Sequence, residues 1–170
     1  MFRKTLIPGA LLLVWLAVAM ATLADTDDEL PELEEVNAIA AMARPPLGVI
    51  FTIREFDEDA LEWVLPRVER YIAILRGRIP GIHLAMMSHG DELAAASIER
   101  RKEYPAMHRR LQRLVRDQGL VFHICNTAAG MMGLGEEDFP DYVNVVPFGP
   151  AQVQDYLAMG YELVDLELTW

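Results

Sequence analysis

Residues 119–133 read Gly-Leu-Val-Phe-His-Ile-Cys-Asn-Thr-Ala-Ala-Gly-Met-Met-Gly, and this stretch decides the fold. A mostly apolar run, Leu120–Cys125, follows a glycine and leads into a turn of small and polar residues. Such a run is typical of a buried strand in a parallel sheet. Cys125, the only cysteine in the chain, ends it. Because sites in open α/β sheets form at the C-terminal ends of strands, we expect any chemistry of this protein here.

Strand and helix patterns alternate around this run. Four further strands are predicted, at 47–53, 82–88, 142–146 and 161–168, and the last alternates polar and apolar residues as an edge strand does. Helical spacing appears at 57–77, 92–118 and 151–159; Pro66 and Pro105 interrupt the first two segments. This order implies right-handed crossovers, and therefore a three-layer α/β/α fold with a mostly parallel five-stranded sheet.

Composition sets broad limits on function. The 170 residues are enough for one domain, and a hydrophobic content of 52% is ample for a packed core. The net charge of −11 argues against a nucleic-acid partner, because most of the surface would repel phosphate. With one cysteine the chain forms no internal disulfide, so the thiol is free, bridged to another chain or inert in the core.

Residues 1–24 have the pattern of a secretory signal. Arg3 and Lys4 precede a long apolar stretch, and Ala19-Met-Ala21 suits a cleavage site, as does Thr22-Leu-Ala24 nearly as well. The alternative is an uncleaved anchor, which would be the protein's single membrane contact. Either reading predicts a periplasmic or secreted domain. Residues 25–46 are an acidic leader, interpreted either as a short amphipathic helix between Pro31 and Ala43 or as a solvated linker.

The cysteine lies where a reactive thiol is plausible. Strand alternation places Cys125, His123 and Val121 on one face of the sheet. Asn126 and Thr127 are predicted to cap a short helix, whose N-terminus would favour a partly exposed thiolate. His123 is a candidate proton acceptor. The alternatives are that Cys125 only fills space in the core and that His123 is an ordinary core histidine.

The chain from about residue 47 to 168 resembles the DsrE/DsrF-like sulfur-relay family. The resemblance is carried by an ordered series of segments: Ser88-His89-Gly90, Asp117-Gln-Gly119, the strand into Cys125 with Asn126-Thr127, Glu136-Glu-Asp138-Phe139, Val143-Asn-Val-Val-Pro147-Phe-Gly149 and Gly160-Tyr161. One difference is that the family usually has one more residue, often glycine, between the cysteine and the Asn-Thr pair. The turn after Cys125 is therefore expected to differ.

The resemblance implies a flavodoxin-like α/β/α fold and a homo-oligomer, a trimer or hexamer. It also implies a sulfur carrier in which Cys125 bears a persulfide, with His123 as the second catalytic candidate. His89, Gly90, Asn126 and Thr127 are the expected substrate-binding residues. The expected partners are a sulfur donor or acceptor protein or a small thiol, and neither a cofactor nor a metal is implied.

Two other classes of function stay open. One is a module that binds Cu(I) or a small ligand, because soft sulfur and imidazole donors gather in or after the second and third predicted strands. These donors are His83, Met86, Met87, His89, His123, Cys125, Met131 and Met132. The other is a non-catalytic oligomeric interaction domain, because one fold supports many functions.

Overall fold

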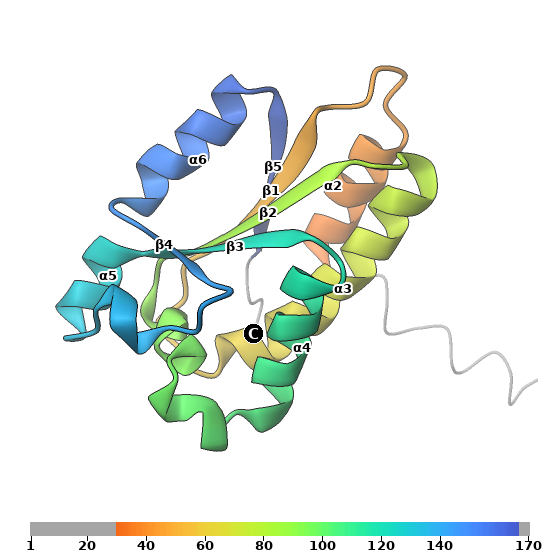
Figure 1. Ribbon diagram of the computed structural model, residues 1–170. Helices are drawn as coiled ribbons and strands as arrows, with labels where there is room; N and C mark the ends of the chain where they lie inside the picture. The colour runs from red at the N-terminus through yellow and green to blue at the C-terminus, as the bar shows by residue number, and fades with distance from the viewer. Residues whose placement is uncertain (1–29, 167–170) are drawn as a thin grey trace, which may run out of the picture. The chain divides into compact units, whose positions relative to one another are not determined.

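A five-stranded parallel sheet forms the centre of the protein, whose computed structural model describes residues 30–166 (Figure 1). The strands are β1 (Gly48–Ile53), β2 (His83–Ser88), β3 (Leu120–Cys125), β4 (Asn144–Val146) and β5 (Tyr161–Leu166). They lie in the order β4-β3-β2-β1-β5, and every neighbouring pair is parallel. The α/β prediction is confirmed, and the sheet is parallel throughout rather than mostly. The edge position of β5 is also confirmed.

Three helices cover one face of the sheet: α2 (Pro31–Ala40), α3 (Ala60–Arg78) and α4 (Pro105–Arg116) (Figure 1). The main core lies between these helices and the sheet, and Phe51 and Phe122 are fully buried in it. Strand alternation explains this, because every second side chain of β1 and β3 points to this layer. Leu120, Phe122 and Ile124 of β3 all lie in this core, as the alternation predicts.

Helix α6 (Gly149–Ala158) packs on the other face (Figure 1). Its Val153 and Tyr156 contact a smaller core that includes Ile50, Met87 and Cys125. The short helix α5 (Asn126–Met131) follows β3 directly. Cys125 therefore ends β3 on the face that α6 covers, opposite to Leu120, Phe122 and Ile124 as strand alternation predicts.

The predicted helix over 92–118 is wrong in its first half. Two 3-10 segments, η1 (Asp91–Ala96) and η2 (Glu99–Lys102), take its place, and α4 begins only at Pro105. A proline disfavours helical backbone at the residue before it, and Tyr104 has φ −113° and ψ 53°. Pro66, in contrast, lies inside α3 with its side chain exposed, so the helix does not begin there.

The acidic leader contributes a packed helix. Val36 and Ile39 of α2 are buried in the main core, and Glu32 pairs with Arg67 of α3 at 3.2 Å. The helical interpretation of this segment is therefore correct for residues 31–40, and these residues are not a solvated linker. The expected signal or anchor at 1–24 lies outside the described residues, as do residues 167–168 of the predicted last strand. Within 30–166, no helix is long and apolar enough to cross a membrane.

Candidate functional site

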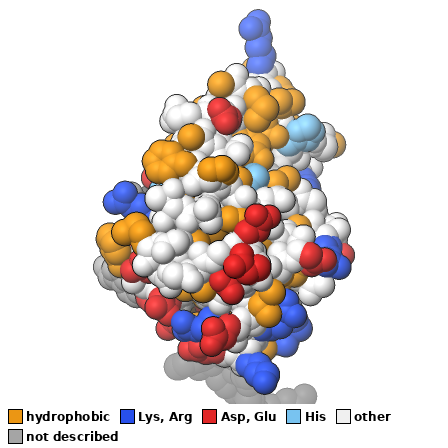
Figure 2. All heavy atoms as spheres, turned by 60° about the vertical axis from the view of Figure 1, so that its left-hand side comes forward, with side chains coloured by type: hydrophobic (Ala, Val, Ile, Leu, Met, Phe, Trp, Pro, Cys, Tyr) orange, Lys and Arg blue, Asp and Glu red, His pale blue; other side chains and the backbone are white. Residues whose placement is uncertain are grey.

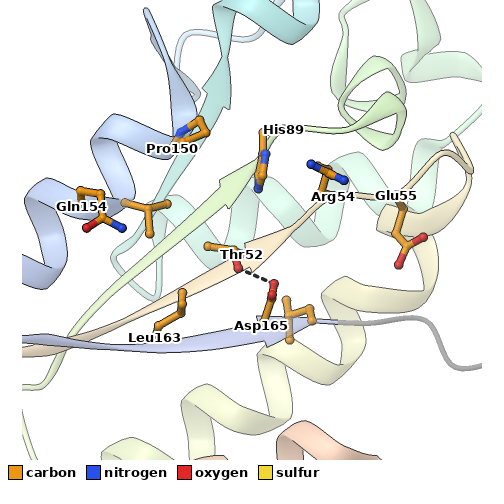
Figure 3. Close-up of a pocket in the computed structure, with 10 residues that line it drawn as sticks. Thr52, Arg54, Glu55, His89, Pro150, Gln154, Leu163 and Asp165 are labelled. Carbon is orange, nitrogen blue, oxygen red and sulfur yellow. Dashed lines mark hydrogen bonds between the residues drawn. The ribbon is translucent and has the colours of Figure 1, made fainter.

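A hollow of about 400 Å³ opens at the C-terminal ends of β1, β2 and β5, beside the first turns of α6 (Figure 3). Its apolar wall consists of Pro150, Val153, Leu163 and Leu166. Its polar wall consists of Thr52, Arg54, Glu55, His89, Gln154 and Asp165. The hollow lies at the edge where parallel α/β sheets place their ligands. Of the predicted site residues, His89 alone lines it.

Charges of both signs lie near His89 in this hollow. The hydroxyl of Thr52 donates a hydrogen bond to Oδ1 of Asp165 at 2.6 Å, which fixes the carboxylate. The pKa of His89 is lowered first by burial and then by the nearby Arg54 cation, whereas Asp165 opposes the shift. Both charges therefore lie close enough to the imidazole to act on it, and His89 is neutral near pH 7.

A buried carboxylate, which sequence reasoning missed, fixes the turn that carries His89. Oε1 of Glu92 accepts hydrogen bonds from the Ser88 hydroxyl at 2.7 Å and the Gly90 amide at 3.0 Å. Its Oε2 accepts one from the Glu55 amide at 2.8 Å. Burial raises the pKa of Glu92, and these hydrogen bonds oppose the increase. The only sequence signal was an acidic residue two positions after the Ser-His-Gly turn.

Gly90 has a structural role in the turn that carries His89. A Cβ atom at this position would lie 2.4 Å from the carbonyl oxygen of Glu55. The β1–α3 connection therefore approaches too closely for any side chain. Gly90 itself is buried and does not line the hollow. Its contribution to the site is to let the Glu92 contacts form around His89.

Cys125 is buried, with a relative exposure of 3%, so the expected partly exposed thiol is wrong for this chain. Its Sγ atom accepts a hydrogen bond from the backbone N–H of Gly149 at 3.2 Å. Gly149 is the first residue of α6, so the sulfur lies at the positive end of a ten-residue helix. The sequence did not indicate this contact, because the two residues are 24 positions apart.

Three side chains meet around Gly149. A Cβ atom on this residue would lie 2.9 Å from Sδ of Met87, 3.1 Å from Cβ of Cys125 and 3.3 Å from Cβ of His89. Gly149 is therefore closely packed, and a side chain there would have to displace Met87. Cys125 and His89 contact the same backbone unit, and Pro150, the next residue, lines the His89 hollow.

The predicted partnership of His123 with Cys125 is not formed. Nε2 of His123 lies 2.8 Å from the hydroxyl of Tyr156 on α6, and its Nδ1 has no partner within the described chain. Burial lowers the pKa of His123 to about 4, so the imidazole is neutral near pH 7. His123 is thus a buried residue that pairs with α6.

Asn126 and Thr127 do not cap the short helix as predicted. Cys125 occupies the N-cap position itself, and Asn126 is the first helical residue. The Thr127 hydroxyl donates to the carbonyl of Pro147 at 2.9 Å, which ties α5 to the loop before α6. Asn126 lines a separate hollow with the acidic Glu136 and Glu137. Neither residue lines the His89 hollow.

The comparisons with known proteins bear only on the fold. No family model matches the chain, and no curated protein matches it. Among solved structures, the fold is similar to that of MTH1491 from Methanobacterium thermoautotrophicum, a protein of unknown function. The TM-score is 0.54 at 19% sequence identity, and the match covers 69% of this chain and 96% of that one. This similarity agrees with the flavodoxin-like α/β architecture.

Proposed function

We propose that the protein is a sulfur carrier of the DsrE/DsrF-like type, in which Cys125 holds a sulfane sulfur as a persulfide. The observation that carries this proposal is the hydrogen bond from the Gly149 amide to Sγ of Cys125. A thiolate and a persulfide are both anions, and an N-terminal helix amide favours negative charge. The same amide would therefore stabilise the charged forms before and after sulfur transfer.

The proposed step is an exchange at one sulfur atom. The Cys125 thiolate attacks the outer sulfur of a donor persulfide, R–S–SH, and a new S–S bond forms. The S–S bond of the donor breaks, and its inner sulfur leaves as the thiolate R–S⁻ with the bonding electron pair. One S–S bond forms as another breaks, so the step needs no external oxidant or reductant.

The proposed carrier is exported and works as a homotrimer or a multiple of it. Export rests on the signal pattern of residues 1–24. Assembly is supported by β5, a six-residue strand at the edge of the sheet with unpaired backbone groups. Hydrophobic side chains also reach the surface at several places in Figure 2. Met131 at the end of α5 and Phe148 just before α6 are 85% and 52% exposed.

Intact-mass spectrometry tests the carrier function. The purified protein is exposed to inorganic polysulfide, desalted and measured with and without a thiol reductant. We expect the mass of one added sulfur atom, which the reductant removes, and no addition on the Cys125→Ser variant. The proposal is wrong if the native protein takes up no sulfur and the thiol reacts only after unfolding. The protein would then be interpreted as a non-catalytic oligomeric interaction domain.

A Cu(I)-binding module is the second candidate, because Met87, Cys125 and His89 meet around Gly149. Two sulfurs and an imidazole suit Cu(I). However, residues 30–166 contain no cluster of three or more His, Cys, Asp or Glu side chains suited to a metal ion. Met87→Leu separates the two candidates: it would abolish Cu(I) binding in a competition titration, whereas persulfide formation on Cys125 would continue.

A further inference from the structure

The His89 hollow has a negative end at Asp165. The Thr52 hydroxyl donates a hydrogen bond to Oδ1 of this carboxylate, and Oδ2 has no hydrogen-bond partner among residues 30–166. The pKa of Glu35 on α2 is raised, first by burial and then by repulsion from Asp165 and Glu162. Negative charge therefore accumulates around Asp165. A cationic group on a ligand would relieve this repulsion and gain a charge-assisted hydrogen bond.

The hollow has a positive end at Arg54. Within the described chain, Arg54 forms no hydrogen bond or ion pair, although the protein as a whole is strongly acidic. In Figure 3 its guanidinium lies beside His89, whereas the carboxylate of Glu55 points away from that imidazole. A neutral His89 near both charges is able to accept or donate one hydrogen bond.

The size of the hollow limits its occupant. A space of about 400 Å³ lies within the range of small-molecule sites, towards its lower end. Its apolar wall suits a short aliphatic or thioether side chain. Pro150 in that wall is next in sequence to Gly149, which contacts both Met87 and Cys125. An occupant in the hollow therefore lies one backbone unit from the residues around the thiol.

We propose that this hollow binds a small amino-acid-type thiol as a zwitterion, with its carboxylate at Arg54 and its ammonium at Asp165. This assignment rests on the proposed function, because it identifies the donor R–S–SH as an amino-acid persulfide and the leaving R–S⁻ as the parent amino-acid thiolate. The thiolate of Cys125 takes the outer sulfur, and the amino-acid thiolate remains as the product.

Unreactive thioethers test the binding without any sulfur exchange. The probes are S-methyl-L-cysteine, 3-(methylthio)propionate, which lacks the ammonium, and 2-(methylthio)ethylamine, which lacks the carboxylate. Binding to the native protein is followed by NMR chemical-shift titration of backbone amides. We expect the zwitterion to shift the amides around His89 and Asp165, and each truncated probe to bind about tenfold more weakly.

Charge variants assign each end of the probe. Arg54→Gln should weaken binding of the zwitterion and of the propionate about tenfold, and it should leave binding of the amine unchanged. Asp165→Asn should instead weaken binding of the zwitterion and of the amine. Arg44→Gln, at an exposed arginine outside the hollow, is the matched control and should change nothing. Equal binding of all three probes, or no effect of either hollow variant, would overturn the assignment.

The same experiment separates the two proposals. If S-methyl-L-cysteine binds as expected but polysulfide leaves no persulfide on Cys125, the ligand site stands and the sulfur-carrier proposal fails. If polysulfide loads Cys125 but the zwitterion shifts no amide of the hollow, the carrier proposal stands and the amino-acid donor is wrong.

Discussion

Nε2 of His123 lies 2.8 Å from the hydroxyl of Tyr156, so the buried histidine of β3 is paired with the helix that covers it. The two rings are tilted, with centroids 5.6 Å apart. Tyr156 also packs edge-on against Tyr161 of β5 at 4.7 Å. This group of aromatic side chains ties α6 to β3 and β5, and His123 is buried beneath it.

The first prediction concerns stability in mild acid. The pKa of His123 is about 4 in the folded protein and about 6.5 when unfolded, so the unfolded state binds the proton first. The contribution of neutral His123 is therefore complete above about pH 6.5 and is lost as the pH falls, by about 3 kcal/mol at pH 4. Urea unfolding across this range measures the loss.

His123→Gln is the variant that isolates this effect, because His89 and His108 also have lowered pKa values and contribute in the same direction. We expect the variant to lose less stability than the native protein between about pH 6.5 and 4. His83→Gln, at an exposed histidine, is the control. Parallel pH profiles for the native protein and His123→Gln would contradict the low pKa.

The second prediction concerns protection of the thiol. We expect iodoacetamide to modify Cys125 much more slowly in the native protein than in urea, because the side chain is buried. Gly149→Ala should increase the native rate and cost about 1–3 kcal/mol, because its Cβ atom would overlap Met87 and displace the first turn of α6. Equal rates for the native and unfolded protein would show that Cys125 is not buried in solution.

Gly77→Ala is the matched control for this glycine substitution. A Cβ atom at Gly77 meets nothing within 4 Å, and the residue lies inside α3. Alanine is a better helix former than glycine, so this variant should be up to about 1 kcal/mol more stable. Its thiol should react at the native rate. A faster reaction would mean that general destabilisation, rather than the α6 turn, sets the reactivity.

The third prediction concerns the carboxylate behind His89. Glu92→Ala leaves the Ser88 hydroxyl and the amides of Gly90 and Glu55 without their buried acceptor. We expect a loss of about 3 kcal/mol in urea unfolding and broadened NMR resonances for His89. Glu99→Ala, at an exposed glutamate, should stay within about 0.5 kcal/mol of the native protein.

The fourth prediction concerns processing and assembly. Protein recovered after secretion should begin at Thr22 or Asp25, which N-terminal sequencing determines. Light scattering of this mature protein should give three times the chain mass or a multiple of it. An intact Met1 in the cytoplasmic fraction would contradict export, and a chain-sized mass at micromolar concentration would contradict the oligomer.

Much of the fold could be predicted because strands of a parallel sheet are continuous apolar runs. Leu120–Cys125 is such a run, and its alternation correctly placed Cys125 and His123 on one face, which α6 covers. The 3-10 segments after β2 could not be predicted in this way. Apolar residues there are buried by packing against α3 and α5, and helical spacing alone does not distinguish a 3-10 turn from an α-helix.

The site was predicted less well, because its contacts join residues far apart in the chain. Position at a strand end indicated Cys125 and His89, but nothing local showed that Gly149 would contact both. The same holds for Asp165 and Thr52, which are 113 positions apart and meet only because β1 pairs with β5. Side-chain contacts of this kind depend on strand order, which sequence periodicity does not specify.

The unequal covering of the sheet has a kinetic consequence. Three helices hold one face, whereas α6 packs on the other largely through Val153 and Tyr156. Segments with few buried contacts open without global unfolding, so amide hydrogens of α6 should exchange faster than those of β1 and β2. Reagents would then reach Cys125 through this partial opening. The free energy of detaching one helix, rather than the full unfolding free energy, would set how often the thiol is exposed to such a reagent.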